Sequence, residues 1–256
     1  MVGSKIKEII NTRVVFIMCH GASIQELEAR IEEFQSYDIC YMSLGLFTVM
    51  EDFILSKINR RLDLIFDCAT LPDPQKDFYE RQIRLPRIEK FLARPDNNLW
   101  ITTHGLLRDA ITPYGPHIYA NYEHKIVRVD SLFPQNKIPF YMDVPNSITL
   151  MIATALYGGA RKIILFGYDG HRGDEASSYS TYYKPELANL EWLQAYGPGI
   201  NYGLKRDTLD FDRRFQSILS LYRQLFGNMA DIVNCSPNSS YNCIRKITYN
   251  HLKEEL

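Results

Sequence analysis

Short apolar runs rich in β-branched residues alternate along the chain with segments in which apolar residues recur every three or four positions. The runs are typical of buried strands, and the wider spacing is typical of amphipathic helices. Strands alternating with helices predict an α/β fold of the Rossmann-like type, a mainly parallel sheet with helices on both faces. Seven strands are predicted: Val14–Cys19, Ile39–Ser43, Leu62–Cys68, Leu99–Thr103, Lys125–Val129, Lys162–Gly167 and Asp231–Cys235.

The first predicted helix begins just after the first strand. Ser23 and Glu26 have the spacing of a capping box, and Ile24, Leu27 and Ile31 follow at helical spacing. Two further helices are predicted, one capped by Asn146 or Ser147 and ended by Gly158-Gly159, and one from about Thr208 to Phe226.

The length of 256 residues and a hydrophobic content of 46% allow one large core. We therefore expect a single domain over residues 1–256, with loop insertions near 72–96 and 172–204. The second insertion is expected to form a lid over the ligand, because it carries a run of Tyr and Ser between Ser177 and Tyr183. An exposed aromatic loop is the alternative reading of that run.

The charge, the hydropathy and the cysteines of the chain argue against a nucleic-acid-binding, membrane-spanning or secreted protein. The net charge is −1, from 29 basic and 30 acidic residues, which gives no electrostatic case for nucleic acid or an anionic membrane as the main partner. No run approaches the ~18 apolar residues of a membrane span, and the first residues lack the features of a signal peptide. Five cysteines have no metal-ligand spacing and suit a reducing compartment. We expect a soluble cytoplasmic protein.

Ligands of open α/β sheets bind at the carboxyl ends of the strands, so the loops that follow the predicted strands are the candidate site. A dinucleotide fingerprint and a phosphate-binding P-loop are both missing, which disfavours NAD enzymes and P-loop kinases. The candidate loops contain His20-Gly21-Ala22-Ser23, Ser43-Leu44-Gly45, Asp67 with Thr70, Gly167-Tyr168-Asp169-Gly170-His171, and Ser236-Pro237-Asn238-Ser239.

Each candidate also has a structural interpretation. Gly21 could supply only a permissive turn and Ser23 only a helix cap, whereas backbone N–H groups at this turn would suit a phosphate. Asp67 could cap a following helix, and Asp169 could form a turn between two glycines. The DxD pattern at Asp210 and Asp212 falls inside a predicted helix, where the two carboxylates point apart, so we expect no metal there.

Three segments together resemble a known family. The segment "NSITLMIATALYGGARKIILFGYDGHRGDEASSYSTYY" is similar to the donor-binding part of the bacterial sialyltransferases that build lipooligosaccharide. The turn "CHGASIQEL" resembles the Gly-Pro-Ser-Leu turn that opens those enzymes and the hydroxymethylpterin pyrophosphokinase-like family, which includes the motility-associated flagellin glycosyltransferases. The segment "VNCSPNSSY" resembles the last strand of the family with its Pro-Asn-Ser ending.

The resemblance implies roles for individual residues. Gly21 and Ser23 match the turn beside the nucleotide phosphates, and Ser147 matches a serine that contacts the donor. Asp169 matches the aspartate of Gly-x-Asp, and Tyr179 matches a tyrosine on the phosphate side. The remaining residues predicted to bind the nucleotide-sugar lie in the same loops: His20, Ala22, Ser43, Asp67, Asn146, Gly167, Tyr182, Asn238 and Ser239.

The chain also departs from the family. Ser43 and Asp67 stand where asparagines that contact the nucleotide are expected, which leaves the CMP preference open. The family's general-base histidine is missing, and Leu204 or a neighbour occupies its place. His171 falls where the sialyltransferases have a second tyrosine, and its near-neutral pKa makes it our candidate base.

The predicted function is a glycosyltransferase of polysaccharide biosynthesis that moves a sugar from a nucleotide-sugar, CMP-linked in the family, to a glycan or another hydroxyl acceptor. The predicted catalytic residues are His171, Asp169 and Tyr179, and Tyr182, Arg172 and Lys184 could help to stabilise the leaving phosphate without a metal or other cofactor.

Two alternatives stay open. A diphosphotransferase would use ATP, Mg²⁺ and a pterin alcohol, with Asp67 and Asp169 as metal ligands. A non-catalytic protein would bind the nucleotide-sugar and lack a base. Whether the chain forms a homo-oligomer is also open.

Overall fold

The structure is a computed structural model, and the fold is described from the following residues: 2–19, 21, 23–44, 49–66, 85–102, 116–128, 147–169 and 204–256. Eight strands form one sheet in the order β5-β4-β3-β2-β1-β6-β7-β8, and each neighbouring pair is parallel. The strands are β1 (Val14–Met18), β2 (Ile39–Leu44), β3 (Leu64–Phe66), β4 (Leu99–Thr102), β5 (Ile126–Arg128), β6 (Lys162–Phe166), β7 (Asp231–Asn234) and β8 (Arg245–Lys246).

Helices connect the strands and cover the sheet. The α-helices are α1 (Val2–Ile10), α2 (Ile24–Arg30), α3 (Val49–Phe53), α5 (Leu85–Leu92), α7 (Pro116–Tyr122), α8 (Ser147–Tyr157) and α12 (Leu204–Phe226). The 3₁₀ segments are η1 (Ile31–Phe34), η3 (Leu55–Ile58), η6 (Glu123–Lys125) and η9 (Tyr249–Glu255). The predicted α/β Rossmann-like fold, with its mainly parallel sheet, is confirmed, and all seven predicted strands are present.

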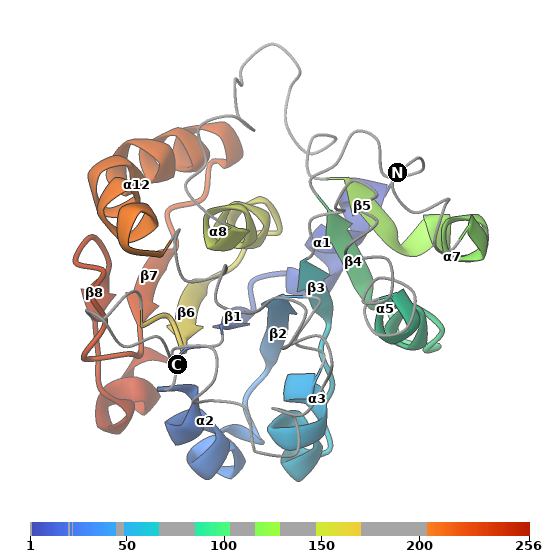
Figure 1. Cartoon of the computed structure of the whole chain (residues 1–256), viewed down its shortest axis with the longest axis horizontal. Coiled ribbons are helices and arrows are strands. Elements are labelled where there is room, and N and C mark those ends of the chain that lie inside the picture. The colour runs from blue at the N-terminus through green and yellow to red at the C-terminus, as the bar shows by residue number, and fades with distance from the viewer. Residues whose placement is uncertain are drawn as a thin grey trace.

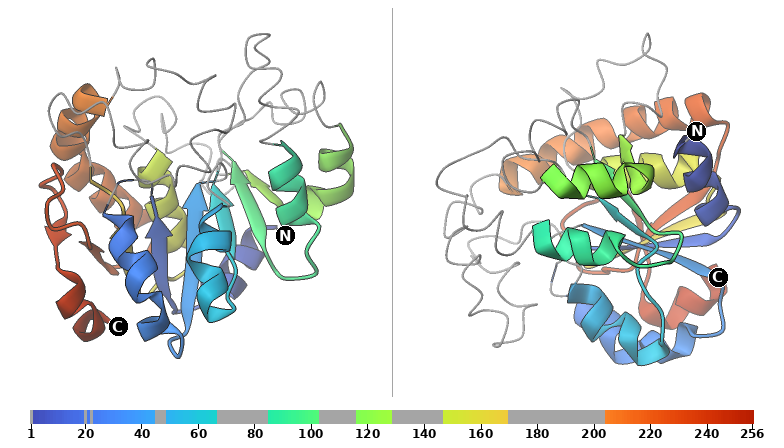
Figure 2. Two further views of the ribbon diagram at one scale, coloured as in Figure 1. Left: turned by 60° about the horizontal axis from the view of Figure 1, so that its bottom comes forward. Right: turned by 90° about the vertical axis from the view of Figure 1, so that its right-hand side faces the viewer.

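The sheet separates two hydrophobic cores. On one face of the sheet, α2, η3, α5 and η9 pack against strand residues whose side chains point to that face, such as Phe16 and Trp100. On the other face, α1, α8 and α12 pack against residues of the opposite strand parity, such as Val15 and Ile17. The edge-on view at the right of Figure 2 shows these two helical layers with the strands between them. Successive side chains of β1 point alternately into the two cores, which explains why the whole strand is apolar.

Strand β1 lies at the centre of the sheet. Phe16 pairs with Tyr41 on one side and with Ile164 on the other, and its ring contacts Phe34 and Phe166 at centroid distances of 5.9 and 4.6 Å. The chain builds the sheet outward from β1 to β5, then returns to place β6 on the other side of β1 (Figure 1). This reversal is the topological switch point at which open α/β sheets form a ligand crevice.

One part of a predicted insertion is regular structure. Within the predicted insertion at 72–96, α5 is the crossover helix between β3 and β4, and it buries Leu85, Ile88, Phe91 and Leu92 in the core. The loop prediction is therefore wrong for this part, because the apolar residues at helical spacing pack on the sheet. Residues 72–84 and 172–203 of the two predicted insertions lie outside the described part of the chain.

The far edge of the sheet was not predicted. Strand β8 is a short Arg-Lys pair beside β7, flanked by the buried residues Ile244 and Ile247. Ion pairs add to this: Arg245 contacts Asp231 and Glu255 at 2.6 Å each, and Lys162 also contacts Glu255. Hydrogen bonds from Arg245 and Lys162 lower the pKa of Glu255 to about 2. No local pattern of hydrophobic residues marks such a strand.

Among the described residues, no helix is both long enough and apolar enough to cross a bilayer.

Candidate functional site

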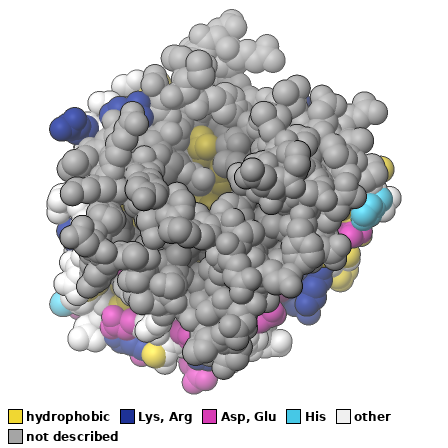
Figure 3. Space-filling view, viewed as in Figure 1, with side chains coloured by type: hydrophobic (Ala, Val, Ile, Leu, Met, Phe, Trp, Pro, Cys, Tyr) yellow, Lys and Arg dark blue, Asp and Glu magenta, His cyan; other side chains and the backbone are white. Residues whose placement is uncertain are grey.

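The candidate site lies at the carboxyl edge of the sheet, around the switch point. In the left view of Figure 2 the arrowheads of the strands point to one edge, so the loops after β1, β6 and β7 share that edge. Since these three strands are neighbours in the sheet, Gly21 and Ser23, Gly167 and Asp169, and Ser236 meet there. In the view of Figure 3, hydrophobic side chains of the described residues are visible at the centre of the face, over α8.

The turns after β1 and β6 approach each other through two glycines. The N–H of Gly21 donates to the carbonyl of Gly167 at 2.7 Å. A Cβ atom at Gly21 would lie 2.5 Å from that carbonyl oxygen and 2.6 Å from Cγ of Asp169, closer than real Cβ contacts allow. Gly167 has φ +64° and a Cβ there would lie 2.7 Å from the carbonyl oxygen of Cys19. Internal packing alone therefore requires glycine at both positions.

Ser23 and Asp169 form the polar centre of the site. The N–H of Ser23 donates to Oδ2 of Asp169 at 2.9 Å, and the hydroxyl of Ser23 donates to Oδ1. The same hydroxyl contacts Oγ of Ser236 at 2.7 Å. Asp169 exposes 6% of its surface and Ser236 none. A buried carboxylate is thus held by a backbone and a side-chain donor of the turn after β1.

The predicted capping box is wrong. Ser23 has helical backbone angles (φ −63°, ψ −15°) and makes no side-chain bond to the N-terminus of α2. Its hydroxyl is directed to Asp169 instead, and the carboxylate of Asp169 supplies the negative charge that favours a helix N-terminus. The carboxylate of Asp169, which follows β6, therefore takes the place of the predicted local cap at the N-terminus of α2.

The loop after β7 fixes the backbone that carries Asp169. The hydroxyl of Ser239 donates to the carbonyl of Tyr168 at 2.7 Å, and the N–H of Ser240 donates to the carbonyl of Asp169 at 2.7 Å. The rings of Tyr168 and Tyr241 stack with centroids 4.1 Å apart. The position of the Asp169 carboxylate is therefore set by two loops, one on each side.

The other predicted site residues in the described part lie further from this centre. Ser43 is buried, and its hydroxyl donates to the carbonyl of Met18 at 3.0 Å, so it links β2 to β1. Ser147 is the first residue of α8, where the sequence predicted a cap at Asn146 or Ser147, and Asn238 is exposed in the loop after β7. Contacts of these residues with a nucleotide-sugar stay predictions.

Several predicted residues lie outside the described part of the chain. They are His20, Ala22, Asp67, Asn146, His171, Tyr179 and Tyr182. Their roles as donor-binding or catalytic groups, like the lid, stay predictions.

Two chemistries can be assessed from the described side chains. Burial, with a smaller contribution from Asp169, raises the pKa of the Cys19 thiol far above its usual value, so Cys19 stays protonated and is no nucleophile. Within the described ranges, no three His, Cys, Asp or Glu side chains lie close enough to hold a metal ion.

The DxD pattern has a structural role at its second aspartate. Asp212 accepts the N–H groups of Asn242 and Cys243 at 3.0 and 3.2 Å.

Ser236 belongs to a loop predicted as a candidate, but of that loop only Asn238 and Ser239 were predicted to bind the donor. Its position directly after the apolar strand 231–235 is the signal that favours Ser236 as well, because the same position selected Asp169.

Comparison of the chain with models of known protein families, with curated proteins and with solved structures gave no match.

Proposed function

We propose that this chain is a glycosyltransferase of the sialyltransferase-like type, which transfers a sugar from a nucleotide-sugar to a hydroxyl group of a glycan or another acceptor. One observation carries the proposal: the turn after β1 and the end of β6 are joined at the switch point by the hydrogen bonds between Ser23 and Asp169. These two segments are the ones in which the sequence resembles the family's donor-binding motifs. A crevice at this edge is where an α/β sheet binds nucleotides.

The contacts refine which part of the donor would lie here. Because the Asp169 carboxylate already accepts the N–H of Ser23, a phosphate at that N–H would meet a like charge. A ribose hydroxyl donates hydrogen bonds and suits a carboxylate, so of phosphate and ribose we favour ribose beside Ser23. In this proposal Tyr179 and Tyr182 bind the phosphate.

In the proposed reaction the bond between the sugar carbon and the phosphate oxygen breaks, and a bond to the acceptor oxygen forms. The acceptor hydroxyl gives its proton to His171, and the nucleotide leaves with the electron pair of the broken bond. Asp169 serves as a positioning residue, since both of its oxygens are engaged by Ser23. His171 follows it by two positions in the sequence, so Asp169 fixes the start of the segment that carries the base.

The test is a thermal-shift screen of the full chain against CMP, UDP, GDP, ADP and ATP, with and without Mg²⁺. We expect CMP to stabilise without Mg²⁺, because a ligand at 100 times its dissociation constant adds about 2.7 kcal/mol. Ser23→Ala should weaken this shift, whereas Ser217→Ala, at an exposed position of α12, should not. Release of CMP from a CMP-sugar, with transfer to an acceptor, then tests catalysis.

Other results would contradict the proposal. Stabilisation by ATP only in the presence of Mg²⁺ would favour the diphosphotransferase alternative. Binding of the nucleotide-sugar with neither hydrolysis nor transfer would favour the non-catalytic alternative. If none of the five nucleotides raised the melting temperature, the proposal of a nucleotide-binding site would be refuted.

A further inference from the structure

A second candidate site lies between α3–η3 and α5, on the face of the sheet that also carries α2 (Figures 1 and 2). These segments enclose a groove of about 580 Å³, which is within the size range of small-molecule sites. None of its residues belongs to the site at the carboxyl edge. A ligand in this groove would therefore be a second ligand, and the inference does not depend on the proposed glycosyltransferase function.

The groove concentrates positive charge. Of its ten lining residues in the described part, five are cationic and two, Glu51 and Asp52, are acidic. The chain as a whole has a net charge of −1, so this excess is local. The cationic residues are Arg60, Arg61, Arg87, Lys90 and Arg94.

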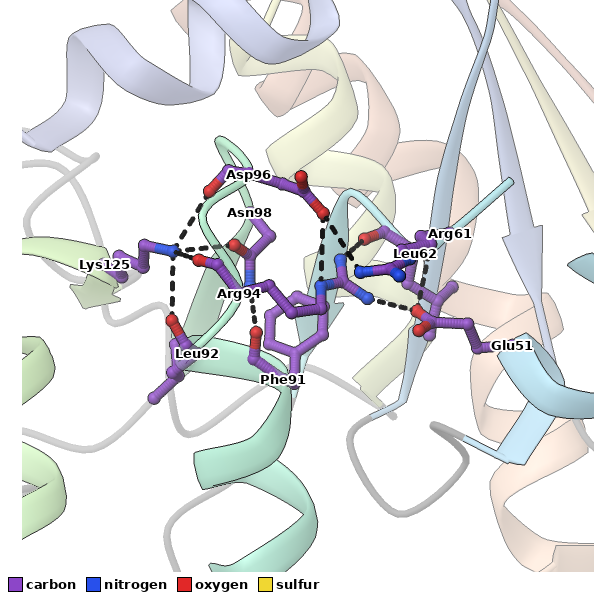
Figure 4. Close-up of polar contacts among 9 residues, drawn as sticks. All are labelled: Glu51, Arg61, Leu62, Phe91, Leu92, Arg94, Asp96, Asn98 and Lys125. Atoms are coloured by element: carbon purple, nitrogen blue, oxygen red, sulfur yellow. Dashed lines mark hydrogen bonds and ion pairs between the residues drawn. The ribbon is translucent and has the colours of Figure 1, made fainter. Parts of the chain in front are cut away.

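Arg94 forms a fixed part of the wall. Its side chain is only 10% exposed, and its guanidinium donates to Oε2 of Glu51 and to the carbonyl of Leu62, each at 2.5 Å. Oδ2 of Asp96 lies 3.5 Å from its Nε. Figure 4 shows the guanidinium between these groups. Oε2 of Glu51 also accepts the N–H of Leu62, so one of the two acids of the groove is already bonded within this wall.

The loop that follows Arg94 is held from the other side by Lys125. The ammonium group of Lys125 donates to the carbonyls of Leu92 and Asp96 at 3.0 Å and to Oδ1 of Asn98 at 2.9 Å (Figure 4). It also bonds to the carbonyl of Arg94. This wall of the groove is therefore preformed, which lowers the conformational entropy that the protein would lose when a ligand binds.

The other cations are available to a ligand. Within the described part of the chain, Arg87 and Lys90 have no hydrogen bond or ion pair. Arg61 is 60% exposed in its side chain and lies 3.7 Å from Asp96, a weak pair, and Arg60 makes one bond to a carbonyl at 3.3 Å. Among the described lining residues, three guanidinium groups and one ammonium group thus remain for a ligand, and Asp52 is the remaining acid.

We propose that this groove binds a ligand that carries several phosphate groups. Planar guanidinium groups match the oxygens of phosphate with paired hydrogen bonds, and an ammonium group adds a compact charge. The groove spans Arg87 and Lys90 of α5 on one side and Arg60 and Arg61 after η3 on the other. Cations from two sides suit a ligand with more than one anionic group.

The experiment uses the full chain and tripolyphosphate as the probe, with binding measured by isothermal titration calorimetry in 0.15 M salt. Removing the two unpaired cations, in the double variant Arg87→Gln/Lys90→Gln, should weaken binding about 10- to 100-fold, because each loses a charge-assisted contact. The control is the double variant Lys7→Gln/Arg213→Gln, which makes the same change in net charge at exposed positions of α1 and α12. Its affinity should stay within about twofold of wild type.

Each other result overturns the proposal. Equal losses in the two double variants would show a general charge effect without a site. Failure of tripolyphosphate to bind the wild-type chain would exclude a phosphate ligand of this charge. Citrate serves as a carboxylate probe. Affinity for citrate equal to that for tripolyphosphate would show that the groove binds anions without selecting phosphate, and tighter binding of citrate would assign it to carboxylates. Circular dichroism melting of all variants checks that none of the losses comes from unfolding.

Discussion

Replacing Gly21 by alanine separates the packing role of this glycine from any role in ligand binding. The sequence alone suggests that Gly21 is small so that a ligand can approach the backbone. The structure provides an internal reason, since an added Cβ would lie 2.5 Å from the carbonyl oxygen of Gly167 and 2.6 Å from Cγ of Asp169. The Gly167 oxygen belongs to the backbone at the end of a central strand and has little freedom to move.

The cost can be worked from these contacts. Overpacking of a tight site costs about 1–3 kcal/mol. If Asp169 moves away, its two hydrogen bonds from Ser23 are lost, and a bond to a charged group contributes about 1.5–3 kcal/mol. We therefore expect Gly21→Ala to lower the free energy of unfolding by about 3–5 kcal/mol in the absence of ligand. Urea unfolding followed by circular dichroism measures this change.

Gly227→Ala is the matched control. Gly227 has φ +63° but nothing within 4 Å of an added Cβ, so the substitution carries backbone strain without crowding and should cost about 1–2 kcal/mol. If Gly21→Ala were as stable as wild type, or were less destabilised than Gly227→Ala, the packing argument would be refuted and a ligand would be the better reason for glycine.

Three further outcomes are expected. Ser236→Ala removes the hydroxyl that lies 2.7 Å from Oγ of Ser23 and should lower the free energy of unfolding by about 1 kcal/mol, measured in urea; no loss would mean that this contact is not stabilising. Because the pKa of Glu255 is lowered to about 2 in the folded chain, its stabilisation is complete above pH 4.5 and is lost as the pH falls toward 2. Glu255→Gln should therefore destabilise by about 1 kcal/mol at pH 7 and show a smaller stability loss than wild type between pH 5 and 3 in thermal melts. His171→Ala should reduce turnover by about 10²–10⁴-fold with little change in donor affinity, and an equal loss in donor affinity would remove His171 as the base.

The strands could be predicted because their apolar character is local. Most described residues of strands β1 to β7 are buried between the two helical layers, and this burial demands a nearly continuous apolar sequence. Strand β8 was missed for the opposite reason. Arg245 pairs with Glu255 and Asp231, and Lys246 donates to the carbonyl of Ser239 and to Oδ1 of Asn242. Neither residue carries a strand pattern.

That Gly21, Ser23 and Asp169 lie together could be predicted from the sequence, but the contacts among them could not. The rule that ligands bind at strand ends selected Gly21, Ser23 and Asp169 from the sequence, and these residues do meet. Ser23 also matched a local capping pattern, and there the prediction failed. The hydroxyl of Ser23 bonds to Asp169, which lies 146 positions away in the sequence. A local sequence pattern cannot show that so distant a carboxylate takes this hydroxyl from the helix N-terminus.

The central place of β1 also has a consequence for the order in which the chain can fold during synthesis. On one side β1 pairs with β2, which follows soon after it, so the half of the sheet from β1 to β5 can assemble from successive pieces. On the other side Val14 pairs with Lys162, so the second edge of β1 stays open until β6 has left the ribosome.

During that interval an apolar strand presents unpaired backbone groups, which is the kind of edge that recruits other chains. Until β6 arrives, aggregation through this edge of β1 competes with correct folding.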